Sequence, residues 1–103
     1  MKENILNINK IINKMNFIHN TISNFVIENE FELNNNLCDI SDLNKINKMI
    51  MEYINLYEEL IEIETTLNDV EYKLMEEELI TLHHKSKKFN NYVLYFENIC
   101  INI

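Results

Sequence analysis

The chain has 103 residues, with nine Lys against seventeen Asp and Glu, and it contains no Gly, Pro, Ala, Arg, Gln or Trp. The formal net charge of −8 and the absence of Arg disfavour direct nucleic-acid binding, which relies on clustered basic side chains and the guanidinium fork. The lack of Gly excludes glycine-rich phosphate loops, dinucleotide fingerprints and nucleophile elbows. Long helices joined by Asn-rich turns are the architecture that remains.

At this length we expect one domain spanning residues 1–103, and 47 % hydrophobic residues are enough to form a core. Lys2 and Glu3 are charged, and no apolar run long enough for a signal peptide or a membrane span follows them. Cys38 and Cys100 are too few for a secreted disulfide framework. We therefore expect a cytoplasmic protein with free thiols and no membrane association.

The first expected helix covers residues 4–28, where apolar side chains recur at three-four spacing and form a broad face. Asn is a poor helix former, so packing must stabilise this helix. His19 lies on the stripe, and we interpret it as a core-edge histidine whose pKa burial would lower. The stripe consists of Ile5, Ile8, Ile12, Met15, His19, Ile22 and Val26, flanked by Ile11, Ile18 and Phe25.

The run 34–36 of three Asn predicts a turn, because Asn tolerates left-handed backbone geometry. Asp39 or Ser41 can cap a second helix over residues 40–64, and Asp39 with Asp42 resembles a capping box. The expected apolar face of this helix consists of Leu43, Ile46, Ile50, Tyr53, Ile54, Tyr57, Leu60 and Ile61.

The pattern is disturbed after Glu64, which leaves two alternatives. Thr66 with Asp69 could cap a third helix over residues 69–100. Alternatively, residues 40–100 could form one continuous helix, because Ile61 and Tyr72 lie close to three whole turns apart. The third stripe consists of Tyr72, Met75, Leu79, Leu82, Ser86, Phe89, Val93, Phe96, Cys100 and Ile103.

Asn90 and Asn91 could also end the third helix and leave residues 92–103 as a strand-like tail. Amphipathic helices bury their stripes best against each other. The sequence therefore predicts an all-α fold, either an antiparallel helical hairpin or a three-helix bundle with coiled-coil-like heptad packing.

No constellation for catalysis or metal binding stands out, so we expect a non-enzymatic protein without cofactor, metal or small-molecule substrate. His83 and His84 point about 100° apart on a helix and cannot chelate one ion together. We interpret them, with the lysines that follow, as a solvated basic stretch. Cys38 lies beside Asp39, an electronegative setting that disfavours a reactive thiolate.

Apolar residues outside the stripes exceed what one small bundle can bury, and exposed apolar patches usually mark interfaces. We therefore expect a protein–protein interaction module, a subunit or adaptor whose partner is another protein or a second copy. The surplus residues are Leu6, Phe17, Met49, Met51, Leu56, Ile63, Val70, Leu74, Tyr95, Ile99 and Ile101. Because the C-terminal segment is apolar on nearly every side, we assign partner binding to Phe89, Tyr92, Leu94, Tyr95, Ile99 and Ile101.

An alternative function rests on the acidic run, since ten carboxylates and one Lys lie between Glu52 and Glu78. Such a face could block a basic, nucleic-acid-binding protein. The composition is also rich in residues with AT-rich codons, which suits a viral or phage inhibitor or decoy. The residues of this acidic face are Glu58, Glu59, Glu62, Glu76, Glu77 and Glu78.

Overall fold

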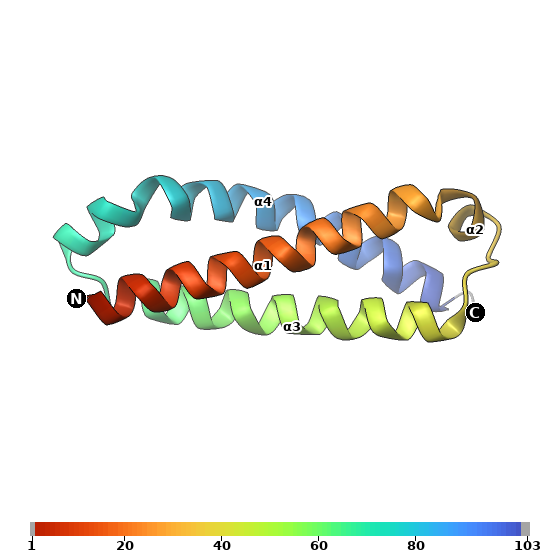
Figure 1. Ribbon diagram of the computed structural model, residues 1–103, viewed down its shortest axis with the longest axis horizontal. Coiled ribbons are helices and arrows are strands. Elements are labelled where there is room, and N and C mark those ends of the chain that lie inside the picture. Colours follow the sequence, from red (N-terminus) through yellow and green to blue (C-terminus); the bar gives the residue numbers. More distant parts are fainter. Residues whose placement is uncertain (1, 102–103) are drawn as a thin grey trace.

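The computed structural model describes the backbone of residues 2–101 and the side chains of residues 3–99. Over that stretch the chain forms helices α1 (Lys2–Glu28), α2 (Glu30–Asn34), α3 (Ile40–Glu64) and α4 (Asp69–Ile101), and no strand. The predicted all-α class is therefore confirmed. The three long helices run along a molecule about 50 Å long and 18 by 17 Å across (Figure 1).

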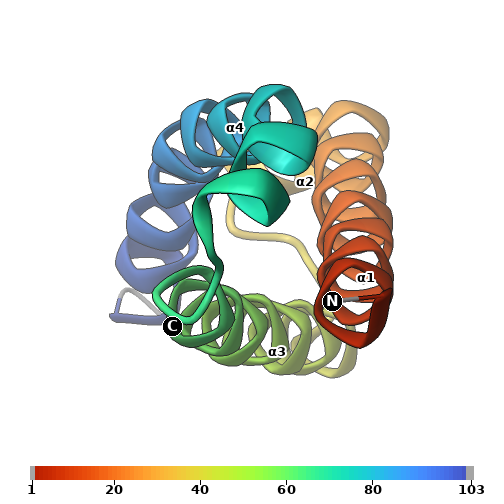
Figure 2. The ribbon, with the colours of Figure 1, turned by 90° about the vertical axis from the view of Figure 1, so that its left-hand side faces the viewer.

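The chain reverses direction twice, so α3 runs antiparallel to both α1 and α4, and α1 runs parallel to α4 (Figure 1). Each long helix contacts the other two, and the α1–α3 pair is the most extensive. Viewed along the long axis, the three helices surround a common line (Figure 2). The two turns therefore lie at opposite ends of the molecule.

The turn between α1 and α3 uses Asn where other proteins use Gly, as predicted. Asn36 has a φ of 55°, in the left-handed region that Asn tolerates. The side-chain amide of Asn29 donates to the Phe25 carbonyl at 2.9 Å where α1 ends. Asp39 caps α3, because its carboxylate accepts the Ser41 N–H at 3.0 Å. The five-residue helix α2 inside this turn was not predicted.

The chain breaks between Glu64 and Asp69, so α3 and α4 are not one continuous helix. The cap of α4 is Asn68, not the predicted Thr66 with Asp69. The Glu71 N–H donates to Asn68 Oδ1 at 2.8 Å, while the Asn68 N–H donates to Glu71 Oε1 at 3.1 Å, a reciprocal capping box. The Thr66 hydroxyl instead donates to the Ile63 carbonyl at 2.7 Å.

Helix α4 continues to Ile101, so the strand-like tail considered for residues 92–103 is not found in the described part. Residues 102 and 103 lie outside it, including Ile103 of the predicted stripe.

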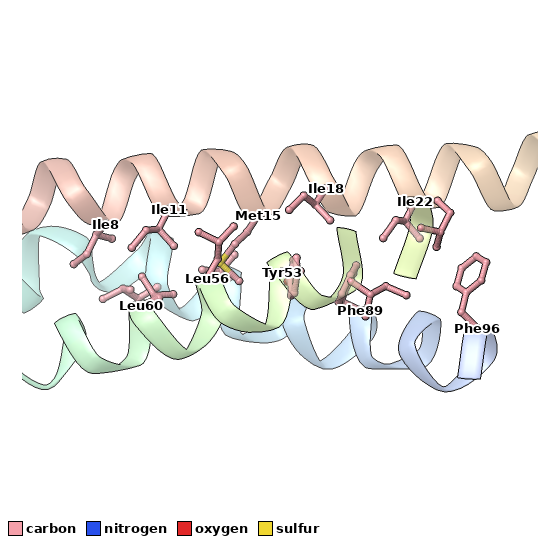
Figure 3. Close-up of a cluster of buried hydrophobic side chains, with 14 of the residues drawn as sticks. Ile8, Ile11, Met15, Ile18, Ile22, Tyr53, Leu56, Leu60, Phe89 and Phe96 are labelled. Carbon is pink, nitrogen blue, oxygen red and sulfur yellow. The ribbon is translucent and has the colours of Figure 1, made fainter. Parts of the chain in front are cut away.

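The core is a continuous cluster between the three long helices (Figure 3). On α1 the buried line is rotated from the expected one: Ile11 and Ile18 are buried, whereas Ile12, His19 and Val26 are only half-buried. Rotation toward Ile11 and Ile18 keeps the imidazole partly hydrated, which reduces its desolvation cost. The buried α1 residues are Ile8, Ile11, Met15, Ile18 and Ile22.

The core also takes in side chains expected at the surface. Leu56 and Ile99 are buried, and Met49 and Ile63 pack half-buried against the cluster. Each long helix has two neighbours, so its buried face is wider than a single three-four stripe. Ile61, expected on the α3 face, is exposed instead.

Truncation of Phe96 tests the core at the C-terminal end of α4. Its buried ring lies 6.4 Å from the Phe25 ring centroid. We expect Phe96→Ala to lower the free energy of unfolding by about 3–5 kcal/mol, because a cavity replaces the ring. Exposed Leu94 is the matched control, and Leu94→Ala should change the free energy of unfolding by about 0.5 kcal/mol or less. Urea unfolding followed by circular dichroism measures both, and equal losses would contradict this packing.

A second test compares the two candidate caps of α4. We expect Asn68→Ala to lower the free energy of unfolding by about 1 kcal/mol, because the Glu71 N–H loses its acceptor. Thr66→Ala should have less than half that effect, since its hydroxyl only donates to an exposed helix-end carbonyl. A larger decrease in the free energy of unfolding for Thr66→Ala than for Asn68→Ala would instead support the cap expected from the sequence, Thr66 with Asp69.

Candidate partner-binding site

A groove of about 440 Å³ lies where α1 ends, α2 begins and α4 approaches its own end. Two segments distant in sequence, residues 26–34 and 91–95, therefore form one surface feature, at the end of the molecule where α2 lies (Figure 1). Four of its lining side chains are apolar or aromatic and three are polar. The lining residues are Val26 and Ile27 from α1, Glu30 and Asn34 from α2, and Asn91, Tyr92 and Tyr95 from α4.

The two tyrosines are held in place by the core beneath them. Tyr92 lies edge-on to Phe89 and His19, with ring centroids 6.2 and 5.8 Å away. Tyr95 lies edge-on to Phe96 at 5.4 Å. Both rings are half-buried, so little rotamer entropy remains for them to lose when a partner binds.

The Tyr95 hydroxyl is neutral at ordinary pH. Its pKa is raised by burial and, to a smaller extent, by the acidic groups of Cys38 and Glu30. The phenol therefore keeps its proton and can both donate and accept a hydrogen bond at the groove.

Three exposed apolar side chains lie in or next to the lining segments. Ile27 lines the groove and is 71 % exposed. Phe31 follows Glu30 on α2 and is 67 % exposed, because Leu33 turns into the core instead. Leu94 precedes Tyr95 on α4 and is 52 % exposed. We call the groove together with Ile27, Phe31 and Leu94 the docking end.

The six residues that the sequence assigned to apolar partner binding fall into surface residues and core residues. Tyr92 and Tyr95 line the groove, and Leu94, which precedes Tyr95, is exposed. Phe89 and Ile99 are 2 % and 8 % exposed, so they belong to the chain's own core and are corrected from contact to core residues. The Ile101 side chain lies outside the described residues.

Sequence reasoning missed Ile27 and Phe31. Ile27 follows the stripe residue Val26 and had no place on the predicted face. Phe31 lies between Glu30 and Glu32, and this charged setting was the signal that its side chain faces water. Phe31 lies outside the periodic segments, whereas Ile27 lies within the first one but off its apolar face.

The acidic residues assigned to the alternative function are spread over several surfaces. Glu58 lines a groove between α3 and α4, whereas Glu59 lines a depression formed by α3 alone. Glu77 and Glu78 line a third feature, between α1 and α4. Glu62 is exposed at the end of α3, and Glu76 is half-buried and pairs with Lys73 at 3.6 Å.

A polar cluster joins α3 to α4, and it corrects the interpretation of His83. The Tyr57 hydroxyl contacts His83 Nδ1 at 2.8 Å, and His83 Nε2 contacts Glu64 Oε2 at 3.0 Å. A neutral imidazole with its proton on Nε2 satisfies both contacts, since Tyr57 donates to Nδ1 and Nε2–H donates to Glu64. His83 therefore connects two helices and is not part of a solvated basic stretch.

The order phenol, imidazole, carboxylate resembles a catalytic relay, but the chemistry of Tyr57 favours a structural role. Burial raises its pKa, and the nearby Glu64 carboxylate raises it further. A phenol held in its neutral form is a poor nucleophile. The cluster is suited to fixing the position of α4 along the axis of α3.

The remaining candidate chemistry is limited. Among the described side chains, no three His, Cys, Asp or Glu lie close enough together to hold a metal ion. Burial, then the carboxylates of Glu32 and Asp42, raise the pKa of Cys38, which favours the thiol over the reactive thiolate. None of the helices within residues 2–101 has the length and apolar character needed to cross a membrane.

Comparisons with protein-family models, with curated proteins and with solved structures gave no significant match.

His19 packs beneath the groove residue Tyr92 and also contacts the rings of Tyr53 and Phe89. Burial lowers its pKa, and the positive charges of Lys85 and Lys88 lower it further, which confirms the direction expected from the sequence. The unfolded chain therefore binds this proton more readily than the folded chain does. Acid destabilises the fold as the pH falls below about 6.5, the usual pKa of histidine.

We expect His19→Leu to be neutral or stabilising at pH 7, and its advantage over the natural chain should grow as the pH falls from 7 to about 5. The measurement is the free energy of unfolding by urea at several pH values. The half-buried Ile12 on the same helix provides the control, because Ile12→Leu changes no titratable group and should leave the acid dependence unchanged. An advantage that stays constant with pH would show that His19 does not titrate differently in the two states.

Proposed function

We propose that this chain is a small non-enzymatic helical interaction module, a subunit or adaptor that binds a protein partner through the docking end. The observation that carries the proposal is a groove lined by exposed Ile27 and two core-held tyrosines, with exposed Phe31 and Leu94 directly next to its lining residues in the sequence. Exposed apolar side chains are ordinary when scattered singly, but a patch beside an aromatic groove is typical of an interface.

The aromatic side chains at the docking end are suited to carrying binding energy. Phe31 presents its ring to solvent, whereas Tyr92 and Tyr95 present rings already fixed by Phe89 and Phe96. Truncation of such anchors commonly costs ~2 kcal/mol or more of binding free energy.

The proposal includes the finer architecture, a three-helix bundle with coiled-coil-like packing between α1, α3 and α4. The three-four spacing of the buried α1 residues Ile8, Ile11, Met15, Ile18 and Ile22 supports this packing. A bundle of this kind presents the ends of α1 and α4 as rigid walls, which lowers the entropy lost on binding.

The second candidate function, a decoy that blocks a basic nucleic-acid-binding protein, is favoured by the net charge of −8 and by exposed Glu58, Glu62 and Glu77. The two functions differ in salt dependence. Binding led by carboxylates weakens steeply with salt, whereas binding led by an apolar groove does not.

Capture of partners from native lysate, followed by mass spectrometry, tests the proposed function. We expect the double variant Ile27→Ser with Phe31→Ser to lose the captured proteins, because both substitutions remove apolar surface from the docking end. Phe17→Ser, at an equally exposed site on the middle of α1, should retain them. Circular dichroism and light scattering establish that the variants are folded and report any change in self-association.

The decoy function predicts the opposite result of the capture experiment. Loss of the captured proteins on reversing Glu58, Glu62 and Glu77 to Lys, with no loss in the Ile27 and Phe31 double variant, would replace the proposed function with the decoy.

A further inference from the structure

We infer that the docking end binds a basic amphipathic helix, whose apolar face fills the groove while its Lys or Arg side chains meet Glu30 and the negative charge of this half of the molecule. This inference rests on the proposed function and names the chemistry of the partner.

The charge in this half of the molecule is mostly negative. Tyr53 contacts His19 and Phe89 in one layer, and residues 20–52 and 90–101 lie on the α2 side of it (Figure 1). These residues contain seven carboxylates and two Lys, and Glu30 lines the groove. Six of the carboxylates are exposed and Glu32 is half-buried. The carboxylates are Glu28, Glu30, Glu32, Asp39, Asp42, Glu52 and Glu97, and the lysines are Lys45 and Lys48. A partner that approaches this apolar surface must therefore offset a net negative potential, and a basic one does so.

The walls of the groove determine the backbone conformation of the partner. They are the helices α1, α2 and α4, whose backbone N–H and C=O groups are largely used within each helix. An extended peptide would find no strand edge to pair with and would lose hydration of its own backbone against apolar side chains. A helix satisfies its backbone internally, so it can place apolar anchors at i, i+3 or i+4, and i+7 into the groove.

The charge also argues against other occupants of an apolar surface. A second copy meeting this end symmetrically would place two surfaces of net negative charge against each other, which is destabilising. An anionic lipid surface would repel the same groups. A positively charged partner is the one that gains from both the apolar and the acidic parts of the docking end.

The probe is a labelled synthetic helix of about five turns, with Leu along one face and Lys on the other, and its binding is followed by fluorescence anisotropy. A peptide of the same composition in scrambled order separates amphipathic recognition from simple charge attraction. We expect the scrambled peptide to bind at least about tenfold more weakly, since it cannot present an apolar face to the groove.

Charge reversals at the two ends of the molecule locate the site with equal changes in net charge. We expect Glu30→Lys, at the groove, to weaken binding about tenfold or more, and Glu77→Lys, far from it, to weaken binding by about twofold or less. Leu94→Ser should weaken binding, whereas Leu74→Ser, equally exposed but near the other end of α4, should not.

Equal weakening by the two charge variants, or equal binding of the scrambled peptide, would overturn the inference by reducing the contact to net charge. Stable self-association or binding to anionic vesicles through Leu94 would also overturn it, in favour of a second copy or a membrane. If lysate capture still depends on Ile27 and Phe31 while the peptide shows no preference, the interaction module stands and only the basic helix is rejected.

Discussion

Phe89 joins the three long helices in a single layer. Its ring stacks on Tyr53 of α3 with centroids 3.6 Å apart and planes 23° from parallel, and it lies 5.4 Å from His19 of α1. Stacking at this distance fixes both the height and the rotation of α4. Ser86, three residues earlier, therefore meets the Tyr53 hydroxyl at 2.9 Å. Tyr92, three residues later, reaches the groove, so the candidate site follows from the core packing.

The helical class and the chemistry of one turn were readable from the sequence, because period, Asn36 and the Asp39 cap are local properties. The rotation of α1 was not, since Ile8, Met15 and Ile22 belong to two overlapping three-four stripes. Only contact with α3 and α4 decides between those stripes. Helix α2 was missed because five residues are too few to show a helical period.

The candidate site was predictable only in part for a related reason. The end of α4 is apolar on nearly every side, so its composition indicates buried and binding residues without separating them. Phe89 and Ile99 turned out to be core, while Tyr92, Tyr95 and Leu94 lie at the surface. The connection of His83 to Glu64 joins residues nineteen positions apart across two helices, and no local pattern encodes it.

The parallel course of α1 and α4 gives the molecule a fixed spacing between its two ends. Residue 2 lies at one end of the 50 Å long axis, and the groove lies at the other (Figure 1). A group attached at the start of α1 is therefore held almost a full molecular length from the groove. In this respect the fold is an elongated scaffold that separates its first helical turn from the proposed docking end by the length of the bundle axis.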